Sequence, residues 1–229
     1  MVINPSPTLS HKDRIFVFFN NHRYTTMKYL YLAVTLLFVT TIAGCSDNST
    51  TAPNNNQNNN NQNTSGDYYP LTKGTFWTYT LYSSSGSRTS TQTVGNDTTV
   101  NGRKYTVVNS SLGEVYLIRH TGTEYYQILN GSETKLFDDQ MGASWSFDIS
   151  TPLSDNHYTF TNVEEGLTQT VQGKTYTNVM RVHAVLITTI PSYPPITYEF
   201  DYYWAKGIGR IKSDLGVQGM EYLIDYSVK

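Results

Sequence analysis

Alternation between apolar and polar residues is the feature of this sequence that most restricts its fold. In the stretch TFWTYTLY, residues 75–82, Trp77, Tyr79 and Leu81 fall on one side of an extended chain. Because successive side chains of a β-strand point to opposite faces, this period of two predicts half-buried strands. The same period recurs further along the chain, in EVYLIR (114–119), HYTFTNV (157–163), ITYEFDYYWAKG (196–207) and MEYLIDYSV (220–228).

The alternating runs are separated by short turn signals. The longest run, TYTNVMRVHAVLITTI from Thr175, predicts one long strand or a bent pair, and the weak pattern around Val163 to Leu167 is the one helical candidate. We predict an all-β domain: a strongly curved antiparallel sheet or open barrel, with a sandwich as the alternative. The turn signals include Ser85-Gly86, Asn101-Gly102, Asn130-Gly131, Gln172-Gly173 and Pro194-Pro195.

Two pairs of segments repeat at nearly the same offset. VNGRKYTVV (100–108) and VQGKTYTNV (171–179) share five of nine residues, and GTFWTY (74–79) is echoed by GASWSF (142–147). The offsets are 71 (171 − 100) and 68 (142 − 74). They predict two related β-meanders of about 70 residues, covering about 68–138 and 139–229.

The N-terminal region has the order of a secretory signal peptide. From Met27 it reads MKYLYLAVTLLFVTTIAGC: a basic start, an apolar run and small residues before Cys45, the one cysteine of the chain. The ending Ile42-Ala43-Gly44-Cys45 resembles the lipobox of bacterial lipoproteins, which implies lipidation of Cys45 and anchoring in a membrane. We therefore assign residues 1–44 to a leader and signal peptide, with Met27 as the favoured start.

A polar, low-complexity segment follows the predicted lipidation site. Residues 45–66, rich in asparagine, cannot bury enough apolar surface to fold and are interpreted as a flexible tether. The β domain then covers residues 67–229. Because Ser46 is not aspartate, the sorting rule of enterobacterial lipoproteins implies an outer-membrane location, but it leaves open which leaflet is used.

Four segments together resemble an uncharacterised group of bacterial lipoproteins from Bacteroidetes and related phyla. These segments are YYPLTKGTFWTYTL, VNGRKYTVV, MGASWSFD and YYWAKGIGRIK. The group shares a start like Y-P-L-x-x-G-x-x-W-x-Y and a late Y-x-A-K-G-x-G segment, where this chain has Trp204 at the place of a residue such as Tyr. The resemblance implies secretion, lipidation and a mainly β domain, and it transfers no catalytic residue.

Charge and residue spacing exclude several classes of function. The chain has a net charge of −2 and no basic stripe, which argues against nucleic acid as a partner. His120, His157 and His183 do not have the spacing of metal ligands, so no metal is predicted. No cofactor is predicted either, because the glycines of Gly207-Ile208-Gly209 precede a strand-like run and not the helix that a phosphate loop requires.

A few residues remain as candidates for binding. Glu199 and Asp201 lie two residues apart on one strand face, roughly 6.6 Å along the strand, a spacing compatible with a hydrolase but also with a solvated face. Tyr198, Phe200, Tyr202 and Trp204 form the opposite stripe, which is predicted to face the core. If exposed aromatic residues bind a sugar, the candidates are Tyr125, Tyr126 and Tyr203.

The leading hypothesis is a non-enzymatic, lipid-anchored lipoprotein of the cell envelope with a binding or structural role. Its partners would be the membrane, through Cys45, and a glycan or an envelope protein. Two alternatives remain: a glycan-binding accessory lipoprotein and a carrier of an apolar or acyl ligand in a curved sheet. A glycoside hydrolase that uses Glu199 and Asp201 is the least favoured.

Overall fold

The computed structural model describes residues 66–229, and in this part of the chain the fold is all-β. A single 3-10 turn, η1 (Gly216–Gln218), interrupts the strands. No helix in this part is long and apolar enough to cross a bilayer. The strands are β1 (Phe76–Ser83), β2 (Gly86–Val100), β3 (Arg103–Ser110), β4 (Val115–Thr121), β5 (Glu124–Leu129), β6 (Ser132–Asp138), β7 (Ser144–Ser150), β8 (Asp155–Val171), β9 (Lys174–Thr189), β10 (Ile196–Ala205), β11 (Gly209–Asp214) and β12 (Met220–Ser227).

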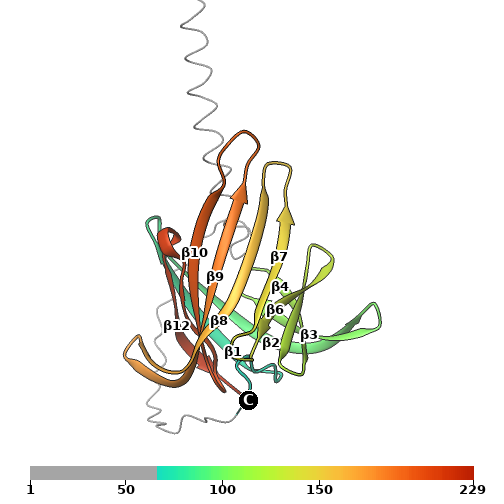
Figure 1. Ribbon diagram of the computed structural model, residues 1–229. Helices are drawn as coiled ribbons and strands as arrows, with labels where there is room; N and C mark the ends of the chain where they lie inside the picture. The colour runs from blue at the N-terminus through green and yellow to red at the C-terminus, as the bar shows by residue number, and fades with distance from the viewer. Residues whose placement is uncertain (1–65) are drawn as a thin grey trace, which may run out of the picture. The chain divides into compact units, whose positions relative to one another are not determined.

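All twelve strands belong to one antiparallel sheet that curls back on itself. Every strand except β6 and β7 pairs with the strands before and after it in sequence, and β12 pairs with β1, so the two ends of the described chain meet. β6 and β7 are the two free edges. The predicted strongly curved antiparallel sheet, or open barrel, is confirmed (Figure 1). The alternative prediction of a sandwich is wrong, because all the strands belong to one sheet.

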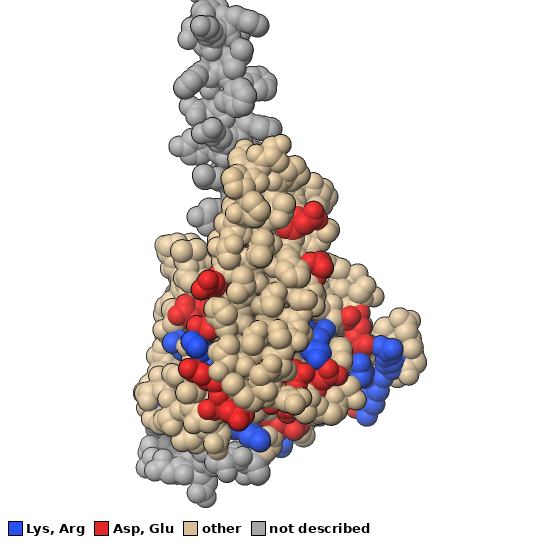
Figure 2. Space-filling model, viewed as in Figure 1, with Lys and Arg blue, Asp and Glu red and all other residues tan. Residues whose placement is uncertain are grey.

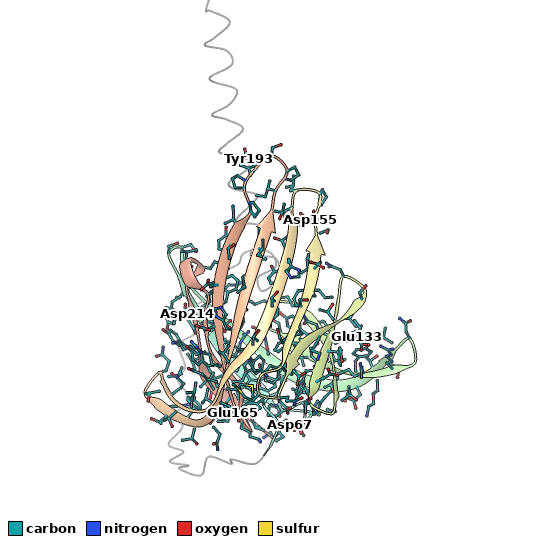
Figure 3. The ribbon with its side chains drawn as sticks, in the orientation of Figure 1. Asp67, Glu133, Asp155, Glu165, Tyr193 and Asp214 are labelled. Carbon is teal, nitrogen blue, oxygen red and sulfur yellow. The ribbon has the colours of Figure 1, made fainter. Side chains whose placement is uncertain are left out.

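The up-and-down order gives the sheet two different ends. We call the end with the turns after β1, β3, β5, β7, β9 and β11 the hairpin end. The opposite end, where β1 begins and β12 finishes, is the terminal end. Figure 3 shows Tyr193 and Asp155 near the hairpin end, and Asp67 and Glu165 near the terminal end.

The segment before β1 fills the interior at the terminal end. Tyr69 is 7% exposed, and its ring centroid lies 5.3 Å from that of Trp77 and 5.4 Å from that of Trp204. The backbone carbonyl of Asp67 accepts a hydrogen bond from Gly207, in the turn between β10 and β11. The residues that follow the predicted tether therefore belong to the folded core.

The predicted helix around Val163 to Leu167 is wrong, because these residues lie in the middle of β8. β8 pairs with β9 along its length, and shifts of register at Glu164 and Leu167 absorb extra residues as β-bulges. Bulges interrupt the alternation of side chains, which is why the sequence does not look like a strand here. Conversely, the run from Thr175 is confirmed as one long strand, β9.

The proposed duplication fits the positions of its segments in the sheet but stays a prediction. The two echoed Gly-turn segments form the β2–β3 and β8–β9 hairpins, which are the second hairpins of the two halves. Their turns have nearly identical φ angles: 50° and 76° at Asn101-Gly102, and 50° and 77° at Gln172-Gly173. The sheet also opens between β6 and β7, at the expected boundary of the two halves.

The side chain of Asn162 forms hydrogen bonds across the gap between β6 and β7 at the terminal end. The amide nitrogen of Asn162, on β8, donates to the carbonyls of Asp138 and Gln140 at 2.7 and 2.6 Å. Its backbone N–H donates to Ala143, just before β7. Asn162 therefore joins β8 to the segment after β6, although β6 and β7 share no ladder.

Candidate functional site

The inner face of β7–β10 carries three rows of side chains, which are aromatic or apolar except for Asn156 and Thr188 in the third row. Strand pairing aligns one inward residue from each strand, so each row crosses four strands. The first row is Trp145, Phe160, Ala184 and Phe200; the second is Phe147, Tyr158, Leu186 and Tyr198; the third is Ile149, Asn156, Thr188 and Ile196. We call these three the aromatic rows.

The rings of the first two rows are stacked across the strands. The centroids of Phe147 and Tyr158 are 5.0 Å apart, and those of Trp145 and Phe160 are 5.4 Å apart with planes 6° from parallel. Such cross-strand aromatic pairs stabilise the sheet and present flat apolar surfaces to the interior.

The aromatic rows are not fully covered toward the hairpin end. Leu186 and Ala184 are buried, but Phe147, Ile149 and Tyr198 are half-buried although they point inward. These inward side chains therefore remain in contact with solvent at that end of the strands. This partly open aromatic surface is the principal candidate for a binding site.

A second set of inward side chains is charged. Arg210, on β11, places Nη2 2.5 Å from Oε2 of Glu221 on β12, and Ser213 also donates to Glu221. A β-bulge explains this inward arginine: Trp204 pairs with Arg210 and Tyr203 with Lys212, so Ile211 is the extra residue. The bulge changes the alternation and turns Arg210 toward the interior.

Tyrosine rings surround this ion pair. The guanidinium of Arg210 lies 4.9 Å from the ring centroid of Tyr79. Burial raises the pKa of Tyr79 and of Tyr202 well above 10, although Arg210 opposes the shift. Burial raises the pKa of Tyr158 to about 12. All three phenols therefore stay protonated over the physiological range and retain a hydrogen atom to donate.

The charge of Arg210 persists despite its burial. Burial alone would lower the pKa of Arg210, but the attraction of Glu221 and of the surrounding tyrosines raises it. The interior thus combines an apolar aromatic side, from β7–β10, with a charged and phenolic side that includes β1, β11 and β12.

A polar network covers part of the outer face of β3–β6. Glu133 forms ion pairs with Arg103 and Arg119 and accepts a hydrogen bond from the hydroxyl of Tyr105 at 2.7 Å. The hydrogen bond from Arg119 contributes most to lowering the pKa of Glu133 to about 2. This network joins strands β3, β4 and β6 without contributing to the interior.

We expect the network to make stability depend on acidity. Because the pKa of Glu133 is lower in the folded chain, its contribution is fully present above about pH 4.5 and is lost as the pH falls toward 2. Solvent screens these outer-face pairs, so the loss should be about 1 kcal/mol. Urea unfolding at pH 7, 4.5 and 2 measures it. Glu133→Gln should show a smaller loss below pH 4.5 than the wild type, and equal losses would contradict the assignment.

The tyrosines suggested by the sequence are not open stacking surfaces. Tyr125, expected to be exposed, is fully buried, because its pairing with His120 turns it inward, where the two rings stack at 4.0 Å. Tyr126 lies on the outer face of β5, beneath the guanidinium of Arg119 at 4.5 Å. Tyr203, on the outer face of β10, is covered by the ammonium of Lys212 at 4.8 Å.

Glu199 and Asp201 share the outer face of β10, as their spacing predicted. Asp201 is 3.6 Å from Arg181 and 3.1 Å from His183, both on β9, whereas Glu199 is exposed. Asp201 is thus part of a cross-strand ion-pair group. The opposite stripe on β10 is confirmed as core for Phe200, Tyr202 and Trp204, which are between 6% and 9% exposed, whereas Tyr198 is half-buried.

The structure does not assemble the predicted candidates into one site. β5 and β10 are separated by several strands, and the inner and outer faces of the sheet divide them further. Sequence reasoning missed the charged inner side. Arg210, close to the aromatic run of β10, was a signal for an inner charge. Its direction could not be predicted, because the bulge at Ile211 that turns it inward cannot be recognised from the sequence.

Two other predictions concern lipid and metal. Cys45 lies outside the described residues. Within residues 66–229, no group of three or more His, Cys, Asp or Glu side chains is arranged to hold a metal ion.

No family model and no curated protein matches this sequence. Among solved structures, a "putative lipoprotein" from Parabacteroides distasonis is 13% identical, with a TM-score of 0.48, and the match covers 71% of this chain and 99% of the other. A "putative exported protein with YmcC-like fold" from Bacteroides fragilis is 11% identical, also with a TM-score of 0.48, covering 71% of this chain and 100% of the other.

Proposed function

We propose that this chain is a non-enzymatic lipoprotein of the cell envelope, anchored through Cys45, whose β domain binds an apolar ligand against the aromatic rows. The observation that carries the binding role is the partial exposure of Phe147, Ile149 and Tyr198 on the inner face. The anchor and the outer-membrane location rest on the sequence before residue 66.

Apolar ligands gain most from such a surface. Each Å² of apolar area removed from water contributes about 25 cal/mol, and the stacked rings present this area without further loss of side-chain freedom. An acyl chain fits this requirement because it needs no specific polar partner along its length. The inner face therefore favours the carrier hypothesis over sugar binding by Tyr126 or Tyr203, whose rings are covered by cations.

At the hairpin end, the loops that join β7 to β8 and β9 to β10 carry exposed apolar side chains, with the carboxylate of Asp155 beside them at the start of β8. Leu153, between β7 and β8, and Tyr193, between β9 and β10, are each 52% exposed. The loop from Ile190 to Pro195 contains no charged residue. In Figure 2 the charged side chains on the visible face gather mainly over its lower half, and some acidic side chains lie over the upper part. An apolar rim of this kind lowers the cost of passing an acyl chain into the interior.

Gly66 and the rim lie at opposite ends of the strands. The tether joins the domain at Gly66, next to Gly207 at the terminal end. The 20 residues between Cys45 and Gly66 belong to the tether that the sequence predicts.

Binding is tested with the chain from Ser46 to Lys229, produced without lipid. We expect dodecyl compounds below their micelle concentration to raise the unfolding temperature, whereas maltooligosaccharides do not. A ligand at 100 times its dissociation constant stabilises the folded state by about 2.7 kcal/mol. The absence of a shift with every dodecyl compound would contradict the proposal.

We expect Phe147→Ala to weaken binding of dodecanol about tenfold, because half-covered contact with this ring contributes roughly 1.4 kcal/mol. The matched control is Ile187→Ala, which removes an apolar side chain from the outer face of β9, where it is 38% exposed. Fluorescence titration measures both dissociation constants. Equal affinities in the two variants would place the ligand elsewhere.

A further inference from the structure

Arg88 is an inward-facing arginine on the sheet. It pairs with Leu81 of β1, and Leu81 alternates with Trp77 and Tyr79, which are buried inside. The side chain of Arg88 therefore leaves the sheet on the same face as the ion pair of Arg210 and Glu221. Its Nη1 atom is buried and has no hydrogen-bond partner.

Arg88 differs from the other arginines of residues 66–229. Each of the other four forms an ion pair with a carboxylate, and Arg88 alone does not. The pairs are Arg103 and Arg119 with Glu133, Arg181 with Glu164 and Asp201, and Arg210 with Glu221.

The carboxylates of Glu221 and Glu114 have other partners. Glu221 also pairs with Leu81, from the opposite side, so it lies two strands from Arg88, roughly 9.5 Å along the sheet. It is bound by Arg210 and Ser213. Glu114, at the hairpin end, accepts a hydrogen bond from the hydroxyl of Tyr116 at 2.8 Å. Neither forms an ion pair with Arg88.

A buried guanidinium nitrogen without a partner is costly, because desolvation is not offset by a hydrogen bond. An anionic oxygen brought by a ligand would offset it, and the planar fork of an arginine binds carboxylate or phosphate oxygens in pairs. Arg88 and the aromatic rows share the inner face of the curved sheet, and Tyr202 lies four strands from Arg88, roughly 19 Å along the sheet. One line of cross-strand neighbours joins them: Arg88, Leu81, Glu221, Ser213 and Tyr202, and the ring of Tyr202 is 6.3 Å from that of Phe160.

We propose that Arg88 binds the anionic headgroup of an amphiphile whose apolar chain lies against the aromatic rows. This inference rests on the proposed function for the apolar chain and adds the class of ligand: a single chain that ends in a carboxylate or a phosphate. The two headgroups share the chemistry that an arginine recognises, and they are separated by the choice of probes.

The test compares dodecanoate, dodecyl phosphate and dodecanol, titrated against the wild-type chain from Ser46 to Lys229. We expect at least one of the anionic compounds to bind ten times more tightly than the alcohol. Arg88→Gln should remove this preference and leave the affinity for dodecanol unchanged. The matched control, Arg103→Gln, changes an arginine on the outer face and should keep the preference.

The outcomes separate the two proposals. If Arg88→Gln keeps the preference for the anion, or if the wild type has none, the role of Arg88 is wrong, although binding of dodecanol would still support the carrier function. If no compound binds, both proposals fail.

Should Arg88→Gln not fold, as judged by circular dichroism, Arg88→Lys replaces it. Lysine keeps the charge but loses the fork, so the preference should fall about threefold or more, and an unchanged preference would overturn the proposal. The tighter of the two anions identifies the headgroup.

Discussion

Gly219→Ala is expected to lower the free energy of unfolding by more than about 4 kcal/mol. A Cβ atom on Gly219 would lie 2.0 Å from the carbonyl oxygen of Tyr82 and 2.9 Å from its carbonyl carbon. Both are backbone atoms at the end of β1, so no side-chain rotation relieves the overlap. The φ of 121° and ψ of −164° also fall in a region occupied almost entirely by glycine.

Urea unfolding followed by circular dichroism measures this loss. Gly86→Ala is the matched control, because Gly86 has the same φ of 121° but no atom within 4 Å of the added Cβ. It should cost about 1–3 kcal/mol for backbone strain alone. Equal losses in the two variants would show that the close approach of Gly219 to Tyr82 does not constrain the chain.

Glu221→Gln is expected to destabilise the domain by about 3 kcal/mol. It removes the carboxylate that faces Arg210, and an unpaired buried charge is the costly result of breaking an interior ion pair. The double variant Arg210→Met with Glu221→Leu should recover most of this loss, because two apolar side chains of similar size need no partner.

A double-mutant cycle on urea-unfolding free energies tests the pair. It needs Glu221→Gln, Arg210→Met and the combination of Arg210→Met with Glu221→Gln. We expect a coupling energy of at least about 1.5 kcal/mol. A coupling near zero would mean that water reaches both groups and screens the pair like one on an outer face.

Much of the architecture could be predicted from the sequence because it depends on local pattern. Period-two alternation fixed which residues of β10 face inward, so Phe200 and Tyr202 were assigned to the core correctly. Turn chemistry was equally readable: Asn101-Gly102 and Asn130-Gly131 both adopt the positive φ angles that such dipeptides favour. These signals need only neighbouring residues, and they led to a curved antiparallel sheet.

Bulges and strand pairing account for what could not be predicted. Whether a bulge forms depends on the partner strand, which the sequence does not identify. The bulges in β8 were therefore read as a weak helical pattern near Val163, and the inward direction of Arg210 could not be predicted. The sequence offered Tyr125 and its neighbour Tyr126 alike as exposed candidates. Which of the two points inward is decided by the register of β5 with β4 and β6.

The sequence by itself determined the all-β class, the positions of most turns and the aromatic stripe of β10, since period-two alternation and turn residues act over a few positions. The signal peptide, the lipidation of Cys45 and the tether are predictions from the sequence alone, and they concern residues before the described part of the chain. The tertiary structure decided that β1 and β12 join the two halves into one sheet, which residues share the interior, and that Arg88 forms no ion pair within residues 66–229. These features depend on contacts between residues far apart in the chain, which only strand order and register bring together.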